Sequence, residues 1–415
     1  MKDIYAEIIT IGDEILYGQI TDTNSQWIGK ELSKIGIKII RKTSVGDYKE
    51  EIVSALNQAL ERATIILMTG GLGPTKDDIT KKTIAEYVGA SLVLDEGVLE
   101  NIKNIFKSRN RKMNDLNKSQ AYIPENSTAL KNSSGTAPGM WIDYHNKILI
   151  SLPGVPHEMK NIMLKYALPK LNSAFDTPYI YHKMIKTIGI GESRIAPMIE
   201  HWENHLPDYI KLAYLPRLGQ VRLRITGVGA KEQIISEVEA QTKTLAKIIE
   251  KYIYAFDDEE VEVTVGKLLK KKKLTLATAE SCTGGRVADK ITDIPGCSLY
   301  FKGGIIAYSN EVKTSQLGVQ ETTLEKFGAV SETTAKEMAE QVRIKYSVDF
   351  GISTTGVAGP DGGTPKKPIG TVYIGVSSAK ETTVKLLNLS EDRMVNIQLT
   401  YIAVLDLLRQ QLLSG

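Results

Sequence analysis

A hydroxyl and a thiol stand side by side in the stretch 278–285, which reads Thr-Ala-Glu-Ser-Cys-Thr-Gly-Gly. The apolar run before it predicts a buried strand, and residues 286–291 predict the first turns of a helix. Backbone N–H groups at a helix start lack partners and carry partial positive charge. Ser281 beside such donors is suited to be a nucleophile with an oxyanion hole, or to hold a phosphate. The simpler interpretation is that Ser281 or Thr283 caps the helix.

A lysine can act as the base for this serine. All five histidines lie at or before position 205, so a base within the same domain cannot be histidine. Lys313 is expected one turn inside a helix at 310–317, after a strand that ends at Tyr308-Ser309. A Ser–Lys pair requires a neutral lysine. Lowering the lysine pKa from about 10.4 to about 7 costs roughly 4.6 kcal/mol, which burial can supply. The alternative is a lysine on an exposed helix face.

Two other features of the C-terminal part offer contacts to a ligand. A glycine-rich turn, residues 354–363, follows an expected strand and includes Thr355 and Gly356. Such a turn offers N–H donors and space, although an ordinary surface loop has the same composition. Arg393 opens the last expected helix, where it can bind a phosphate with two N–H groups or pair with Glu391.

A second constellation follows the continuous apolar strand expected at 64–68. Small and polar residues gather there, namely Gly70, Gly71, Gly73 and Thr75. In a doubly wound sheet, ligands bind at the carboxyl ends of the strands, and glycines let backbone N–H groups approach a phosphate. The stretch is not a Walker A loop, because it lacks the final Gly-Lys-Ser/Thr.

Several carboxylates are expected at the same edge of this sheet. They are Asp13, Glu14, Asp47, Asp77 and Asp78. Carboxylate oxygens are the ligands that Mg²⁺ or a similar ion prefers when it binds a phosphate. The alternative is structural: Asp78 caps a helix and Asp47 starts a turn.

The order of expected elements predicts three domains, 1–172, 173–257 and 258–415. The first alternates strands (5–11, 37–44, 64–68, 147–152) with helices (22–35, 50–62, 78–88, 95–110, 157–171), which predicts a doubly wound α/β fold. The second follows the order β-α-β-β-α, typical of a small KH-like α+β domain. Its stretch Gly189-Ile190-Gly191-Glu192 lacks the Gly-x-x-Gly loop of RNA-binding KH domains, so a spacer or dimerisation module is favoured.

The third domain is predicted to be α/β. Its expected strands are 274–279, 301–308, 349–354, 369–377 and 382–388, and its expected helices are 260–270, 284–291, 310–317, 331–346 and 393–412.

Composition excludes several classes of protein. Of 415 residues, 42% are hydrophobic, yet no apolar run approaches the ~18 residues of a membrane span. An acidic residue near the N-terminus argues against a signal peptide, so a cytoplasmic protein is expected. Two cysteines are too few for a disulfide framework or a four-cysteine zinc site. A net charge of +3 is too small to imply a nucleic-acid or membrane partner. His201 and His205 lack the glutamate of a zinc-protease motif.

The motifs together resemble those of the competence- and damage-inducible CinA family over essentially the whole chain. The N-terminal matches are 12–16, 22–24, 70–80 and 152–156; the middle matches are 189–193 and 213–216; the C-terminal matches are 279–285, 308–313 and 356–363. The first domain resembles the molybdopterin-binding fold of MogA, MoaB and MoeA, and the third resembles a nicotinamide mononucleotide deamidase of the PncC type.

The resemblance implies an amidohydrolase that converts nicotinamide mononucleotide to nicotinic acid mononucleotide and ammonia. Ser281 is then the nucleophile and Lys313 its base, and Tyr308 orients the lysine or lines the pocket. The N–H groups of Cys282 and Thr283 are suited to hold the oxyanion. The resemblance further implies that Gly284, Thr355 and Gly356 contact the substrate and that Arg393 binds its phosphate.

The same resemblance implies that the first domain is a metal-dependent ADP-ribose pyrophosphatase in some members, with Asp47 and Asp78 at acidic positions of the fold. Three functions therefore remain open: a deamidase, a pyrophosphatase as the main activity, or a non-catalytic partner in DNA uptake or repair. A homodimer acting on small nucleotides is expected, and nucleic acid is a less favoured partner.

Overall fold

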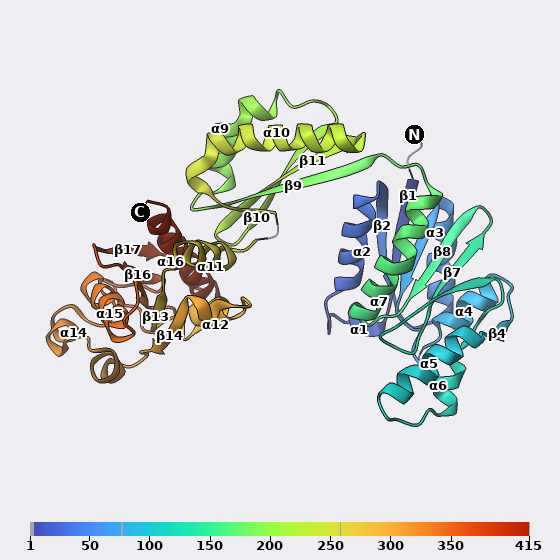
Figure 1. Cartoon of the computed structure of the whole chain (residues 1–415), viewed down its shortest axis with the longest axis horizontal. Helices are drawn as coiled ribbons and strands as arrows, with labels where there is room; N and C mark the ends of the chain where they lie inside the picture. Colours follow the sequence, from blue (N-terminus) through green and yellow to red (C-terminus); the bar gives the residue numbers. More distant parts are fainter. Residues whose placement is uncertain (1–3, 76–77, 258, 415) are drawn as a thin grey trace. The chain divides into compact units, whose positions relative to one another are not determined.

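The computed structural model describes residues 4–75, 78–257 and 259–414. The chain forms two compact units. The first contains the described residues up to 181 together with 227–235, and the second contains the others. The first unit is built on a six-stranded sheet, and the second holds a five-stranded sheet and most of a four-stranded one (Figure 1).

The six-stranded sheet has the order β2-β1-β3-β8-β7-β6. Its strands are β1 (Ile4–Ile11), β2 (Ile37–Val45), β3 (Ile65–Thr69) and β8 (Lys147–Leu152), all parallel, and β6 (Ser127–Leu130) and β7 (Gly139–Tyr144), which make antiparallel pairs. The helices are α1 (Asp13–Leu16), α2 (Thr23–Lys34), α3 (Lys49–Arg62), α4 (Thr80–Tyr87), α5 (Glu96–Ser108), α6 (Asp115–Ser119), α7 (Pro156–Ile162) and α8 (Leu168–Ala174). A small sheet joins β4 (Leu92–Leu94) to β5 (Tyr122–Pro124).

Apolar side chains cover both faces of the six-stranded sheet. Successive residues of a strand point to opposite faces, so Ile8 and Ile9 of β1 enter different cores. Ile8 packs with Ile28 of α2 and Met159 of α7, and Ile9 packs with Leu56 of α3. This two-sided burial explains the continuous apolar runs in the sequence. The predicted doubly wound fold is confirmed.

The four-stranded sheet has the order β10-β11-β9-β12, with α9 and α10 on one face (Figure 1). Its elements are β9 (Tyr179–Ile188), α9 (Glu192–Glu203), β10 (Ile210–Arg217), β11 (Gln220–Gly229), α10 (Lys231–Ile249) and β12 (Ile253–Phe256). The predicted order β-α-β-β-α is confirmed and is followed by β12, a four-residue strand too short to show periodicity.

The five-stranded sheet has the order β14-β13-β15-β16-β17. Its elements are α11 (Val261–Lys272), β13 (Leu276–Glu280), α12 (Arg286–Thr292), β14 (Phe301–Ile306), α13 (Asn310–Val312), α14 (Glu321–Phe327), α15 (Glu332–Lys345), β15 (Phe350–Gly356), β16 (Thr371–Ser377), β17 (Thr382–Asn388) and α16 (Arg393–Ser414). Strands β14, β13 and β15 are parallel, so their carboxyl ends meet at one edge.

Some expected elements differ in the structure. The helix expected at 310–317 is a short α-helix followed by a π-helical turn, Lys313–Leu317. The helix expected at 157–171 is likewise interrupted by a π-helical turn, Met163–Ala167. Strands β6 and β7 and helix α14 lie in stretches for which no strand or helix was expected. These elements are short, and a single π-helical turn of five residues is too short for apolar spacing to reveal.

Candidate active site

Two polar side chains meet at the carboxyl edge of the five-stranded sheet. Ser281 directly follows β13, and Lys313 begins the π-helical turn after α13. The Lys313 Nζ atom lies 3.1 Å from Ser281 Oγ. Ser281 is 8% exposed and Lys313 is 1% exposed. The alternative of a lysine on an exposed helix face is therefore wrong.

Lys313 Nζ also donates to two backbone carbonyls. It lies 2.8 Å from the oxygen of Ala307 and 3.0 Å from that of Tyr308. A neutral amine has two N–H groups and one lone pair, so the carbonyls can take both hydrogens and leave the lone pair facing the Ser281 hydroxyl. Burial lowers the pKa of Lys313 below its ordinary value, and Cys282 opposes this shift. The arrangement suits a general base.

The turn after Ser281 leaves two adjacent N–H groups without an acceptor. The Ser281 N–H donates to the Thr354 carbonyl, and the Gly284 N–H donates to the Ser281 carbonyl. Between them, the N–H groups of Cys282 and Thr283 donate to no carbonyl in the part of the chain that the structure describes. Two adjacent donors beside a nucleophile can hold an oxyanion.

Neither Ser281 nor Thr283 caps α12, so the capping interpretation is wrong. The N-cap residue is Gly285, which has no side chain that could cap the helix. The Thr283 hydroxyl instead donates to Glu280, 2.6 Å away, and lies 2.7 Å from the Thr354 hydroxyl.

A cavity of about 250 Å³ opens over the Ser–Lys pair. Most of the residues predicted to catalyse or bind substrate line it, namely Ser281, Cys282, Tyr308, Lys313, Thr355, Gly356 and Arg393. Thr283 and Gly284 are not in the lining, and the Thr283 hydroxyl is buried against Glu280 and Thr354. The sequence analysis missed Ala329, Val330 and Asp361, which also line the cavity. Asp361 lies in the glycine-rich turn 354–363, and its place in that turn was the feature of the sequence that could have identified it.

Arg393 and Tyr308 are joined at the rim of this cavity. One guanidinium nitrogen donates to the Gly359 carbonyl at 2.7 Å, and another donates to the Tyr308 hydroxyl at 3.1 Å. Arg393 thus binds these groups rather than Glu391. The Tyr308 side chain is 59% exposed, and it is its backbone carbonyl that contacts Lys313. The Thr355 hydroxyl donates to the Ala329 carbonyl, 2.7 Å away.

The thiol beside Ser281 is not suited to attack. Burial raises the pKa of Cys282 to about 12. A thiol is nucleophilic as the thiolate, which is scarce at neutral pH when the pKa is so high. Ser281 is thus the better nucleophile of the two.

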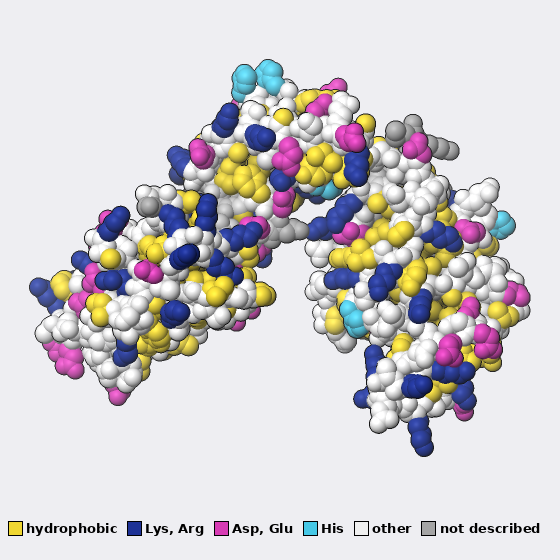
Figure 2. Space-filling model, in the orientation of Figure 1, with side chains coloured by type: hydrophobic (Ala, Val, Ile, Leu, Met, Phe, Trp, Pro, Cys, Tyr) yellow, Lys and Arg dark blue, Asp and Glu magenta, His cyan; other side chains and the backbone are white. Residues whose placement is uncertain are grey.

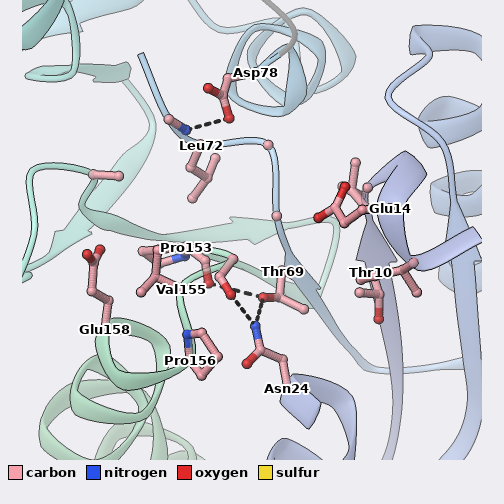
Figure 3. A pocket seen from close by; sticks show the side chains of 18 of the residues that line it. Thr10, Glu14, Asn24, Thr69, Leu72, Asp78, Pro153, Val155, Pro156 and Glu158 are labelled. Carbon is pink, nitrogen blue, oxygen red and sulfur yellow. Dashed lines mark hydrogen bonds between the residues drawn. The ribbon is translucent and has the colours of Figure 1, made fainter. Parts of the chain in front are cut away.

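A second cavity, of about 650 Å³, lies at the carboxyl edge of the six-stranded sheet (Figure 3). Gly70, Gly71 and Gly73 line it as predicted, and Thr75 does not. The sequence analysis gave no role to Asn24, whose side-chain amide donates to Thr69 Oγ1 at 3.0 Å and to the Gly154 carbonyl at 2.7 Å (Figure 3). These bonds join the start of α2, the end of β3 and the loop after β8 in the cavity wall.

The predicted metal-binding carboxylates are only partly brought together. Glu14, Asp47 and Asp78 line the second cavity; Asp13 does not, and its buried Oδ1 has no partner among the described residues. Asp77 lies outside the described residues. Within the described ranges, no group of three potential ligands is placed to hold a metal ion.

Asp78 has a structural task in this cavity. Its carboxylate accepts from the N–H groups of Gly73 at 2.8 Å and Thr75 at 2.9 Å, so it holds the glycine-rich loop. The N-cap of α4 is Ile79, so the interpretation of Asp78 as a helix cap is wrong. Glu14 and Asp47 are then the carboxylates of this cavity that could serve a Mg²⁺ ion, which usually takes only one or two protein carboxylates beside phosphate oxygens and water.

No helix in the described part of the chain is long and apolar enough to span a membrane.

Three family models match the chain: a probable molybdopterin binding domain over residues 7–173, a damage-inducible protein CinA KH domain over 182–255, and a CinA C-terminal domain over 258–412.

Full-length relatives are also similar. A CinA-like protein of Cytophaga hutchinsonii is 52% identical over 99% of this chain and 98% of its own. A putative competence-damage inducible protein of Acetivibrio thermocellus is 43% identical over 99% of both chains. A solved CinA structure of unknown function from Thermoplasma acidophilum is 35% identical over 41% of this chain and 98% of its own, with a TM-score of 0.38. The chain therefore belongs to the CinA family of competence- and damage-inducible proteins.

Proposed function

We propose that the C-terminal domain is an amidohydrolase that converts nicotinamide mononucleotide to nicotinic acid mononucleotide and ammonia. The observation that carries this proposal is the buried contact of 3.1 Å between Lys313 Nζ and Ser281 Oγ, with Nζ also bonded to the carbonyl oxygens of Ala307 and Tyr308. The substrate itself comes from the family resemblance.

The reaction follows from these groups. Lys313 takes the Ser281 proton as the serine oxygen attacks the carboxamide carbon. The N–H groups of Cys282 and Thr283 stabilise the oxyanion, each by roughly 3 kcal/mol. Lys313 then gives the proton to the departing ammonia, and an acyl-serine remains. Water attacks that ester with Lys313 again as base, which releases the carboxylic acid and restores Ser281.

Two features at the cavity rim support a nucleotide substrate. The Arg393 guanidinium has five N–H groups, of which two are used by Gly359 and Tyr308. The others can bind the 5′-phosphate. A cavity of about 250 Å³ suits the nicotinamide ring and part of the ribose. The test is ammonia release from nicotinamide mononucleotide by the purified chain, compared with Ser281→Ala.

A second activity, hydrolysis of ADP-ribose to AMP and ribose 5-phosphate, is favoured by the cavity of about 650 Å³ in the first domain. Gly70, Gly71 and Gly73 line it and suit a diphosphate. Glu14 and Asp47 would hold a divalent ion, which would polarise the phosphate and activate water. AMP formation that EDTA abolishes would support this activity.

A non-catalytic partner in DNA uptake or repair is the competing proposal. On the face of the molecule in Figure 2, basic side chains are interspersed with acidic and apolar ones. A nucleic-acid groove instead gathers basic and aromatic side chains along one path. Tight, salt-sensitive DNA binding in a gel-shift assay would favour the partner over the enzyme.

A further inference from the structure

The residue before the nucleophile, Glu280, is buried and fully hydrogen-bonded. It ends β13 and is 2% exposed. One carboxylate oxygen accepts from the Thr283 hydroxyl at 2.6 Å and from the N–H groups of Gly285 and Val287, both at 3.0 Å. The other accepts from the Ala288 N–H at 2.8 Å. Four donors, three of them at a helix start, offset the free-energy cost of burying this carboxylate.

These bonds leave a defined pair of donors beside Ser281. Every other N–H group from 281 to 288 has an acceptor: Thr354 for Ser281, Ser281 for Gly284, Thr283 for Arg286, and Glu280 for Gly285, Val287 and Ala288. Only the N–H groups of Cys282 and Thr283 donate to no other residue among those described. Glu280 thus occupies the N–H groups at the start of α12 and leaves those of the turn beside Ser281, where Cys282 lines the cavity and Thr283 lies directly behind it in the chain.

The backbone must double back for one carboxylate to reach both the turn and the helix. Gly285 has a φ of 98°, in the left-handed region that favours glycine. This conformation brings the first N–H groups of α12 around Glu280. Because an internal carboxylate occupies them, the start of α12 cannot hold a substrate phosphate, which was the alternative reading of this turn.

We propose that Glu280 is a positioning residue for deamidation, a role that rests on the proposed function. It fixes the turn 281–285 between β13 and α12, so that the oxyanion donors at Cys282 and Thr283 keep their place beside Ser281. Glu280 touches no reacting atom. Its removal is therefore expected to slow the chemical step while leaving substrate and product binding nearly intact.

The test uses the full chain and compares wild type with Glu280→Gln, Glu280→Ala and a matched control, Ser353→Ala. Ser353 is a buried neighbour on β15 whose hydroxyl donates to the Ala335 carbonyl at 2.6 Å, so the control also loses a buried hydrogen bond of the same sheet. The measurements are kcat and KM for nicotinamide mononucleotide, thermal unfolding, and the stoichiometry of nicotinic acid mononucleotide binding by calorimetry.

Glu280→Gln is expected to lower kcat about tenfold and Glu280→Ala about 100-fold, with KM changed less than about threefold, by analogy with lost oxyanion donors. The variants should still bind one nicotinic acid mononucleotide per chain. A lower kcat with this stoichiometry intact means that the donors are misplaced in a folded protein. Ser353→Ala lowers the unfolding temperature but keeps kcat. If Glu280→Ala does not fold, Glu280→Gln, which has the same size, decides.

Unchanged kcat in the Glu280 variants would overturn the positioning role, as would a loss of kcat matched by an equal loss of product-binding sites. In both cases the wild-type protein still releases ammonia, so the proposed deamidase function would be unaffected. A wild-type protein that releases no ammonia would overturn the proposed function, and the role of Glu280 with it.

Discussion

Lys313 Nζ lies 3.1 Å from Ser281 Oγ, although 32 positions separate the two residues in the chain. The sheet creates this contact. Strands β13 and β14 are parallel neighbours with Glu280 paired to Ile306, so the residues that follow them emerge at the same edge. The Ala307 N–H then donates to the Glu280 carbonyl at 2.7 Å, which keeps the two chains together one residue beyond β14.

Replacement of the nucleophile is the first prediction. Ser281→Ala removes the atom that attacks the carboxamide, so ammonia release should fall by at least about 1,000-fold. The variant should unfold at nearly the wild-type temperature, because a small hydroxyl is lost at a cavity. Ser353→Ala, a buried serine outside the cavity, is the control and should stay active. Deamidation at the wild-type rate by Ser281→Ala would reject the mechanism.

The pH dependence of deamidation is the second prediction. Lys313 acts only as the neutral amine, so kcat/KM should rise with pH and level off above the pKa of Lys313 in the folded protein. Burial lowers that pKa from 10.5, so the midpoint should lie below 10.5. Lys313→Arg keeps a charge but no base, and should be inactive at every pH. A flat profile from pH 6 to 10 would contradict the assignment.

Stability should respond to the same group, with a sign fixed by linkage. The folded pKa of Lys313 is lowered, so at pH values between this folded pKa and the unfolded value of 10.5 the unfolded chain binds more protons at this site. The lysine therefore costs stability at low pH, and this cost disappears as pH rises toward 10.5. Relative to Lys313→Met, wild type should gain unfolding free energy between pH 7 and 10 in urea titrations.

Sequence reasoning found the Ser–Lys pair because the absence of histidine after position 205 left lysine as the base. Parallel strand ends were enough to place both residues at one edge. The role of Glu280 was not visible, because a glutamate at the end of a strand gives no sign of the four donors that the following turn brings to it. Asn24 was missed for the same reason, since its partners lie 45 and 130 positions away.

Loss of the phosphate contact is the third prediction. Arg393→Met should raise KM for nicotinamide mononucleotide about tenfold or more, because a charge-assisted bond to the phosphate is lost. Nicotinamide riboside, which lacks the phosphate, should be turned over equally slowly by variant and wild type. Lys302→Met, at an exposed position of β14, is the control and should behave as wild type. An equal loss on both substrates would assign Arg393 to the fold of the rim through Gly359 and Tyr308 instead.

Two glycines of the first domain give the fourth prediction, which concerns stability. Gly70 has a φ of +115°, and an added Cβ would lie 2.0 Å from the Ile11 carbonyl oxygen. Gly18 has a φ of +69° and open space around it. Gly70→Ala should therefore cost about 2–4 kcal/mol of unfolding free energy and Gly18→Ala about 1 kcal/mol. Equal losses of unfolding free energy in urea titrations would mean that the positive φ alone accounts for the loss. The contact between an added Cβ at Gly70 and the Ile11 carbonyl oxygen would then contribute nothing.

The fifth prediction separates the two proposed activities. Asp78→Asn replaces a carboxylate that holds the N–H groups of Gly73 and Thr75, so the glycine-rich loop should loosen. AMP formation from ADP-ribose should fall at least about tenfold, because charge-assisted bonds are the stronger ones. Asp115→Asn, at an exposed position of α6, is the matched control. Ammonia release from nicotinamide mononucleotide should be unchanged in both variants and in EDTA, since the Ser–Lys pair belongs to another sheet and uses no metal in the proposed mechanism. AMP formation that withstands both EDTA and Asp78→Asn would reject a metal-dependent pyrophosphatase at this cavity while leaving the deamidase intact.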